Sequence, residues 1–301
     1  MKKCSLIALT MIIFVWTIPG MSQDLEQRVS SLEDKLDRLE TKLDSLLELL
    51  KTKVIEMPVY EVMKDSLHLL YGIAGNKGTI LDKHYFIINH NDKRKIPYWV
   101  AYYLSVSNLQ GNTPRTDDFR TDQQLPAGKR AELEDYRGSG YDRGHNAPAA
   151  AFKRSREAMS ATFLLSNMSP QTPKLNRNIW RILEEQVRNM VQEKGEGWII
   201  TGNICMDADS NRTQPIEYIG TDSVAVPTHC FKAVLLMDEN GSYYMYAFLL
   251  PNQREYIQGK PADYLLTVDR LEHITGYDFF PGLDDADENS LESVIPGTWP
   301  R

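Results

Sequence analysis

The 301-residue chain is poor in cysteine and has no excess of positive charge. Three cysteines cannot build a disulfide-rich scaffold, and none belongs to a CxxC pair of the kind that binds zinc. Lys and Arg total 34 against 41 Asp and Glu, so the net charge of −7 excludes a wholly basic nucleic-acid coat but permits a local basic face. An apolar content of 42% excludes disorder as the main state. Any metal ion is expected to have ligands other than cysteine.

Residues 1–23 have the order of a secretory signal peptide. Two lysines precede a run without charged residues from Ser5 to Gly20, and small residues follow before an acidic segment. An uncleaved membrane anchor is the alternative, because this run is only slightly shorter than the roughly 20 residues that span a bilayer. In either case we expect export to the periplasm or the extracellular space, with no membrane span once the signal is cleaved.

Signal cleavage would remove Cys4 and leave Cys205 and Cys230 as a pair. Disulfides persist in oxidising compartments, so we expect these two cysteines to be bonded. The alternative is two buried free thiols that pack as small hydrophobic side chains.

Residues 24–53 carry the heptad pattern of a coiled coil. Apolar residues alternate at spacings of four and three between residues 25 and 50, without Gly or Pro. Basic residues at the g positions face acidic residues at the e positions of a parallel partner, which predicts a parallel homo-oligomeric stalk, either a dimer or a trimer. The alternative is an amphipathic helix docked on its own domain. Two apolar positions per heptad make an apolar stripe that is too narrow for such docking. The apolar positions are Leu25, Val29, Leu32, Leu36, Leu39, Leu43, Leu46 and Leu50.

Beyond residue 53 the pattern changes to short strand-like runs separated by turn residues, with one helix predicted over residues 176–193. Asn240-Gly241 predicts a tight hairpin between the last two runs. This arrangement indicates an α+β fold with a largely antiparallel sheet flanked by helices. Residues 284–301, with five acidic residues and one arginine, are expected to form a solvated acidic tail. The strand-like runs are 84–90, 98–106, 197–205, 230–237 and 243–250.

Four short motifs follow one another in the centre of the chain. They are DRGH at 142–145, SNMSPQ at 166–171, LNRNIW at 175–180 and a single Glu184. In this order they resemble the signature of the sugar-non-specific DNA/RNA endonucleases of the ββα-metal, or His-Me finger, superfamily. The resemblance extends over about residues 84–283, so residues 54–283 are interpreted as the nuclease domain.

The resemblance implies a role for three residues of these motifs. His145 would be the general base, a role that suits a side chain whose ordinary pKa is near neutrality. Asn176 would be the ligand of a Mg²⁺ ion, with Mn²⁺ as a possible substitute, because one weak oxygen ligand leaves Mg²⁺ most of its waters. Glu184 lies about two helical turns later and could hydrogen-bond water around the metal. The ordinary alternatives are a structural histidine, an asparagine N-cap and an exposed helical glutamate.

Four further residues are assigned by the same resemblance. Asn167 would hold a loop or the substrate, Arg143 would neutralise phosphate charge, and Asp142 would fix the backbone and side chains around it. The family also has an arginine upstream of the motif that assists the transition state, for which Arg115 and the nearby Arg120 are both candidates. Residue 146 departs from the family pattern, since it is Asn where an apolar residue is more usual.

A basic segment surrounds these motifs. Residues 153–188 contain seven Lys and Arg against three Glu, a net charge of +4 that suits a phosphate backbone. Arg177 and Arg181 are predicted to bind substrate from this segment, although an ordinary solvated helix face would look similar. No base-reading motif occurs, which indicates contact with phosphates and little sequence specificity.

With the signal-like segment, the resemblance therefore implies an exported, Mg²⁺-dependent endonuclease that acts on DNA and RNA and leaves 5′-phosphorylated products. A narrower preference for RNA or small phosphodiesters remains open, because the same base and metal serve either sugar. The competing interpretation is an exported coiled-coil interaction protein whose nuclease fold is inactive or only binds.

Overall fold

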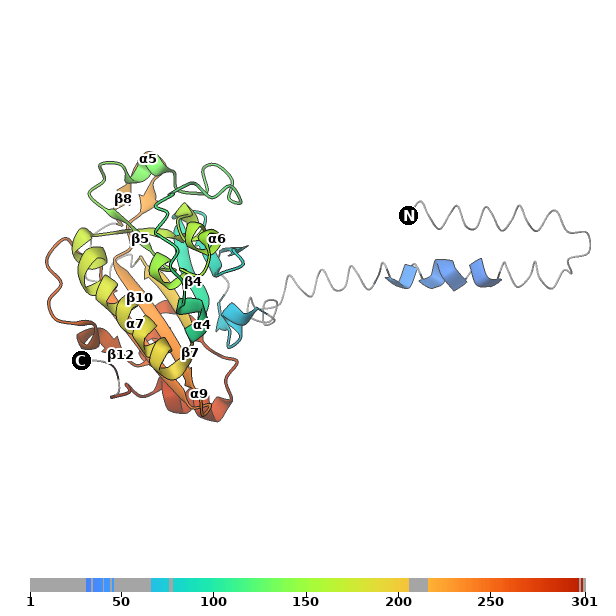
Figure 1. Cartoon of the computed structure of the whole chain (residues 1–301). Helices are drawn as coiled ribbons and strands as arrows, with labels where there is room; N and C mark the ends of the chain where they lie inside the picture. The colour runs from blue at the N-terminus through green and yellow to red at the C-terminus, as the bar shows by residue number, and fades with distance from the viewer. Residues whose placement is uncertain are drawn as a thin grey trace, which may run out of the picture. The chain divides into compact units, whose positions relative to one another are not determined.

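The computed structural model describes residues 31–33, 35–39, 41–43, 45, 66–75, 78–205, 216–297 and 299 (Figure 1). The chain divides into two units, residues 1–57 and 58–301. The predicted signal peptide lies outside the described residues. Among the residues that are described, no helix is both long and apolar enough to cross a bilayer.

In the first unit, the described residues between 31 and 45 are helical and exposed. The heptad leucines among them leave 53 to 64% of their surface open to solvent. This helix is what the heptad pattern predicts for one chain, and the parallel oligomer stays a prediction. These leucines are Leu32, Leu36, Leu39 and Leu43.

The second unit is built on a seven-stranded sheet in the order β12-β11-β10-β7-β4-β3-β2, in which all neighbours are antiparallel. It confirms the α+β class and the five predicted strands. Its strands are β2 (Thr79–Asp82), β3 (Ile87–Asn91), β4 (Ile96–Ser105), β7 (Gly195–Ile204), β10 (His229–Asp238), β11 (Tyr243–Pro251) and β12 (Leu265–Leu266).

Three two-stranded pairs and several helices complete this unit. The pairs are β1 (Ile73–Ala74) with β13 (Asp278–Phe279), β5 (Asp142–His145) with β6 (Met168–Gln171), and β8 (Tyr218–Ile219) with β9 (Val224–Ala225). The α-helices are α4 (Val106–Leu109), α5 (Leu133–Tyr136), α6 (Arg156–Ala161), α7 (Arg181–Lys194), α8 (Val268–Thr275) and α9 (Asp285–Glu292). The other helical turns are η1 (Leu67–Leu69), η2 (Ala149–Ala151), η3 (Leu165–Asn167), η4 (Leu175–Trp180) and η5 (Pro261–Tyr264).

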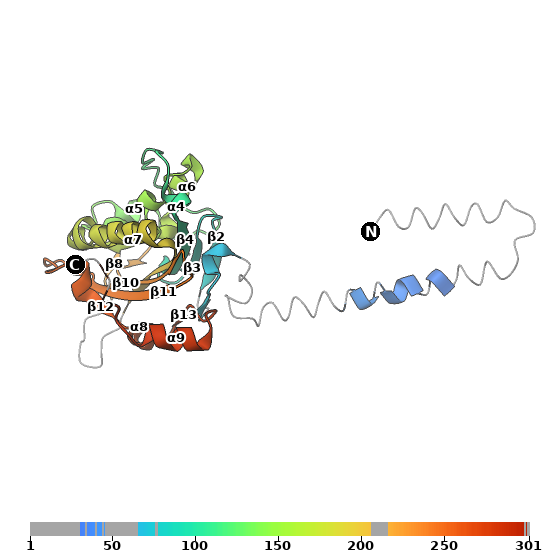
Figure 2. The same ribbon diagram turned by 60° about the horizontal axis from the view of Figure 1, so that its bottom comes forward.

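Helices cover both faces of the large sheet, with α7 on one side and α8 and α9 on the other (Figure 2). Alternation along the strands produces this three-layer arrangement, because successive side chains point to opposite faces. In β4, Val100 and Tyr102 pack in the cluster with Leu183 of α7. Trp99 of the same strand packs in the cluster with Leu271 of α8. The central strands are therefore apolar on both faces, as their near-continuous hydrophobic runs indicated.

The predicted hairpin joins β10 and β11. Gly241 has a φ of +79°, which glycine adopts without steric cost, and its N–H donates to the carbonyl of Asp238 at 2.9 Å. The strands then pair from His229 with Pro251 to Met237 with Tyr243. The hairpin at Asn240-Gly241 is thus confirmed.

The segment after residue 283, expected to be a solvated acidic tail, forms helix α9 (Asp285–Glu292), and its acidic residues other than Glu288 and Glu292 are exposed. Asp284 caps helix α9 by accepting from the N–H of Ala286 at 3.1 Å, and Glu292 at its end is buried. Farther on, Trp299 is only 3% exposed and packs edge-on against Tyr246 and Phe248. The segment is held to the unit by partly buried Leu291 and by Trp299, two apolar side chains that its acidic composition obscured.

The expected disulfide between Cys205 and Cys230 is not formed. Cys230 pairs across the sheet with Asn203, so Cys205 lies two residues farther along the chain than the position opposite Cys230. Such diagonal neighbours are usually about 7 to 8 Å apart, which exceeds the Cβ separation that a disulfide tolerates. Instead the Cys230 thiol lies 3.5 Å from Nε2 of Gln171 within the core.

Candidate active site

The DRGH motif is strand β5, paired with β6 from the SNMSPQ motif. Gly144 stands opposite Ser169, and a Cβ atom at Gly144 would lie 2.3 Å from the side chain of Gln171. Glycine is therefore required by this close approach. The strands β5 and β6 are followed by η4 and α7, which form the ββα unit implied by the resemblance.

His145 lies at the end of β5 against two aromatic rings. Its ring packs edge-on on Phe163 at 4.9 Å and on Phe119 at 5.7 Å between centroids. Burial, together with the charges of Arg115 and Arg143, lowers the pKa of His145 to about 3. Among the described residues its Nε2 atom has no hydrogen-bond partner, whereas the ring also forms a hydrogen bond with the backbone of Arg143. A neutral imidazole with one free nitrogen is the form that can accept a proton.

Two arginines stand around this histidine on the same aromatic rings. The Arg143 guanidinium lies 3.9 Å above Phe119, and that of Arg115 lies 4.8 Å from the Phe163 centroid. The charge of Arg115 also acts on Glu184, so Arg115 is within electrostatic reach of both the histidine and α7. These positions place two cations where a phosphate would approach His145.

Arg120, the other upstream candidate, is directed elsewhere. Its Nη1 atom donates to the Asp118 carboxylate and to the carbonyl of Ser160, both at 2.9 Å. Arg115 pairs only with an exposed neighbour, Asp117, at 2.6 Å. The geometry therefore favours Arg115 as the arginine that serves the site.

Asp142 connects the DRGH motif to the LNRNIW motif. Its Oδ2 atom accepts from Asn176 Nδ2 at 2.9 Å and from Arg177 Nε at 2.8 Å, while Oδ1 accepts from the same guanidinium at 2.5 Å. Burial alone would raise the pKa of Asp142, but these donors outweigh it and lower the pKa. Because Asn176 donates through its amide nitrogen, its Oδ1 oxygen remains available to a hard cation.

Asn176 lies within a π-helical turn, η4, that continues into α7. In a regular α-helix, eight residues rotate the chain by two turns and about 80° more, which would separate Asn176 from Glu184 around the axis. The wider π turn reduces this offset and brings the two residues toward one face. Helix capping belongs to Thr172, whose Oγ1 accepts from the N–H of Leu175 at 3.3 Å, so Asn176 is not an N-cap.

Glu184 faces the core side of α7 toward a buried lysine. Lys232 is fully buried, donates to Thr201 Oγ1 and lies 3.4 Å from the hydroxyl of Tyr102 and 5.0 Å from the ring centroid of Trp180. Burial raises the pKa of Glu184, and the charge of Lys232, then that of Arg188, opposes this rise.

Lys232 is not among the residues predicted from the sequence. The sequence feature that could have revealed it is a single lysine within the otherwise apolar run of β10. Buried lysines are rare unless they are paired, so such a residue in a central strand indicates a functional or structural partner.

Asn167 was expected to hold either the loop or the substrate, and the structure corrects its assignment as a substrate contact. The side chain is completely buried, and its amide bonds to the backbone of Ala147 in both directions, at 2.9 and 3.0 Å, and to the carbonyl of Thr162 at 2.8 Å. It therefore clamps the loop after His145. The unusual Asn146 joins this network, donating to Ser169 Oγ at 2.9 Å and accepting from Asn203 at 3.0 Å.

The predicted basic segment is largely exposed around these motifs. Arg177 and Arg181 expose 68% and 61% of their side chains, although the first pairs with Asp142 and the second with Glu185 at 3.3 Å. Both keep guanidinium surface open to solvent. The other exposed cations of the segment are Lys153, Arg154, Arg156 and Lys174.

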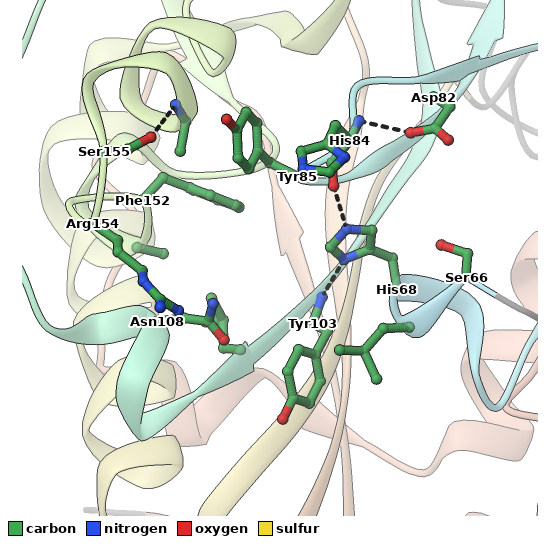
Figure 3. A pocket seen from close by; sticks show the side chains of 14 residues that line it. Ser66, His68, Asp82, His84, Tyr85, Tyr103, Asn108, Phe152, Arg154 and Ser155 are labelled. Atoms are coloured by element: carbon green, nitrogen blue, oxygen red, sulfur yellow. Dashed lines mark hydrogen bonds between the residues drawn. The ribbon is translucent and has the colours of Figure 1, made fainter.

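A separate cleft of about 870 Å³ opens between η1, the β2–β3 turn, α4 and the start of α6 (Figure 3). At its edge, His68 accepts from the N–H of Tyr103 at 3.1 Å, and its Nε2 lies 3.0 Å from the His84 carbonyl. None of the predicted site residues lines this cleft. The catalytic candidates on β5 and α7 therefore lie outside this cleft.

Comparison with known proteins agrees with this geometry. A family model described as DNA/RNA non-specific endonuclease matches residues 65–286. A nuclease from Nostoc sp. is 36% identical over 247 residues, covering 76% of this chain and 86% of the relative, and human mitochondrial endonuclease G is 32% identical over 233 residues, covering 76% and 77%. A chain in a crystal structure of the EndoG/EndoGI complex is similar with a TM-score of 0.69 and 27% identity, covering 73% of this chain and 93% of that one. This chain belongs to the DNA/RNA non-specific endonuclease family, and it is a hydrolase of the nuclease class.

Proposed function

We propose that the protein is an exported, Mg²⁺-dependent endonuclease that cuts DNA and RNA without sequence preference and leaves 5′-phosphorylated products. The observation that carries this proposal is the orientation of two side chains, His145 and Asn176. His145 is neutral with Nε2 free, and Asp142 turns the amide nitrogen of Asn176 inward so that its oxygen is available.

In the proposed mechanism, His145 Nε2 takes a proton from the attacking water as that water approaches phosphorus in line with the leaving oxygen. The aromatic rings of Phe119 and Phe163 hold the imidazole in place, and its burial together with the charges of Arg115 and Arg143 keeps it neutral. Arg115 and Arg143 stabilise the additional negative charge that develops on the phosphate oxygens. Each of these side chains therefore has one task in the reaction.

The residues present fit a magnesium ion. Asn176 Oδ1 would hold it, and Glu184 on the same helical face would orient water around it. When bound, Mg²⁺ supplies positive charge to the leaving 3′ oxygen. Asp142 and Arg177 fix the Asn176 amide before any ligand arrives.

Export and oligomerisation belong to the same proposal. The signal-like residues 1–23 support transfer to the periplasm or the extracellular space, and the heptads between residues 25 and 50 support a parallel homo-oligomer. If the signal remains uncleaved, the same segment would anchor the enzyme to a membrane.

The deciding experiment uses circular single-stranded DNA and a long RNA as substrates, with Mg²⁺ or with EDTA. Because a circle has no ends, its cleavage requires an endonuclease. We expect metal-dependent cutting of both polymers, and a loss of about 10²- to 10⁴-fold in His145→Ala. End-labelling then tests for the 5′-phosphate.

His273→Ala is the matched control, because His273 is an exposed histidine on α8 far along the chain from the motifs. It should cut like the original protein. Intact DNA and RNA with Mg²⁺ and Mn²⁺ would instead support the coiled-coil interaction protein, and cutting of RNA alone would narrow the substrate.

A further inference from the structure

Five carboxylates from three different elements meet beneath the large sheet, on the side opposite α7. Helices α8 and α9 lie side by side there (Figure 2). One oxygen each of Asp269, Glu272 and Glu292 lie within 4.8 Å of one another, and the same holds for Asp278, Glu288 and Glu292. Glu292 belongs to both groups and is therefore the centre of what we call the Glu292 cluster.

Glu292 is buried without a hydrogen-bond partner for one of its oxygens. It exposes only 8% of its surface, and its Oε1 atom has no hydrogen-bond partner in the part of the chain that the structure describes. A buried carboxylate in this condition is costly unless an ion or proton compensates it. The charged groups that act on Glu292 are themselves carboxylates, so they add to this cost.

Backbone contacts and helix spacing orient the other members. The N–H of Phe279 donates to Glu272 Oε1 at 2.7 Å. Asp269 and Glu272 share a face of α8 because they are three residues apart, and Glu288 and Glu292 share a face of α9 because they are four apart. The helices thus present paired carboxylates to a common point.

The electrostatic interactions within the cluster also favour a bound positive charge. Burial and the neighbouring carboxylates raise the pKa of Glu292 to about 8, and burial is the main cause that raises the pKa of Glu272 to about 7. The carboxylates repel one another at these short separations, and a cation bound among them would relieve that repulsion.

We propose that the Glu292 cluster binds a calcium ion that ties α9 to α8 and β13. Its donors are all carboxylate oxygens, which select a hard cation, whereas zinc prefers nitrogen and sulfur ligands. Calcium accepts six to eight oxygens in flexible geometry, while Mg²⁺ requires a near-octahedral arrangement and usually takes one or two carboxylates. The site does not depend on the proposed nuclease function.

The test is thermal unfolding of the purified protein with EDTA, Ca²⁺ or Mg²⁺, with binding followed by titration calorimetry. Ca²⁺ at about a hundred times its Kd should raise Tm by about 5 to 10 °C, and Mg²⁺ should raise it less. Glu292→Gln and Asp278→Asn should each abolish the Ca²⁺-dependent rise. Because both substitutions remove charge, they should leave the metal-free protein folded or more stable.

Two controls separate this site from the others. Asp287→Asn, an exposed α9 residue outside both groups, should keep the full Ca²⁺ response. Asn176→Ala, which removes the proposed catalytic ligand, should keep it too. No response to Ca²⁺, an equal response to Mg²⁺, or an undiminished response in Glu292→Gln would overturn the calcium site, as would a Tm that rises only when the pH is lowered.

Discussion

At the scale of single residues, the site depends on positions where one side chain fixes the size or the orientation of another. Gly144 has no side chain because Gln171 occupies the space that a Cβ atom would need. Asn176 can present its oxygen because Asp142 takes its amide hydrogen. Some residues of the DRGH and SNMSPQ motifs are therefore required by the packing of β5 against β6, and others by the chemistry of the site.

Gly144→Ala tests this packing. The added methyl group would overlap the Gln171 side chain, so we expect the free energy of unfolding to fall by about 1 to 3 kcal/mol in urea titrations. Gly297→Ala, where a Cβ atom would meet nothing within 4 Å, is the control. Equal stability of the two variants would show that β5 and β6 can separate without cost.

The two upstream arginines differ in a way that kinetics can resolve. Arg115→Ala removes a cation that faces His145, and we expect kcat to fall by about 10²-fold or more. Arg120→Ala removes a guanidinium that bonds to Asp118 and Ser160, so kcat should stay close to that of the original protein. Initial rates on one DNA substrate measure both, and a reversed order would assign the role to Arg120.

At the scale of elements, helix α7 and strand β10 form one unit across the core. The π turn η4 positions Asn176 relative to Glu184, and Lys232 from β10 supplies charge beneath that glutamate. Since the pKa of His145 is lowered to about 3, this histidine stays neutral between pH 5 and 8. The acid side of the pH profile should therefore report on Glu184.

Lys232→Met should move that acid limb to higher pH. The lysine charge favours the ionised carboxylate, so its removal raises the pKa of Glu184 further and reduces the ionised fraction at neutral pH. Profiles of kcat/KM against pH measure the shift, and Lys260→Met, an exposed lysine, is the matched control. An unchanged profile in Lys232→Met would mean that the ionisation of Glu184 is not needed.

Trp299 anchors the C-terminal segment to the core, which the acidic composition of that segment does not indicate. The indole packs against Tyr246 and Phe248 and donates to Gln186 Oε1 of α7 at 3.1 Å. We expect Trp299→Ala to lower the free energy of unfolding by about 3 to 5 kcal/mol, measured by urea titration. Val294→Ala, at a 56% exposed residue, should change it little, and a similar small effect of Trp299→Ala would contradict the packing.

At the scale of the whole molecule, we expect the two units to have separate tasks. The described heptad leucines are exposed on the first unit, and exposed leucines in a row at this spacing favour association with further copies. The nuclease unit has its own core on both faces of the sheet. Oligomerisation and cleavage should therefore be separable.

The double variant Leu36→Lys/Leu43→Lys should be monomeric in light scattering and retain its rate of cleavage per chain on short substrates. Charges at two heptad a positions cannot pack in a coiled-coil seam. Thr41→Lys/Ser45→Lys places the same charges at described, exposed positions outside the apolar stripe and should keep the oligomer. A monomeric original protein, or an oligomeric leucine variant, would contradict the stalk.

Local sequence information was sufficient for the elements and for the family. Short strand-like runs between turn residues predict the five strands, Asn240-Gly241 predicts the hairpin, and the ordered motifs identify the nuclease family, because each signal lies within a few neighbouring residues. These features need no knowledge of what packs against them.

Only the tertiary structure decided the features that depend on residues far apart in the chain. It buried Asn167, separated Cys205 from Cys230 by the sheet register, and placed Lys232 under Glu184. It also folded the acidic segment into α9 and gathered the Glu292 cluster from three elements. Burial, register and the sum of charges at a point arise from packing between distant segments, so the composition of any one segment could not reveal them.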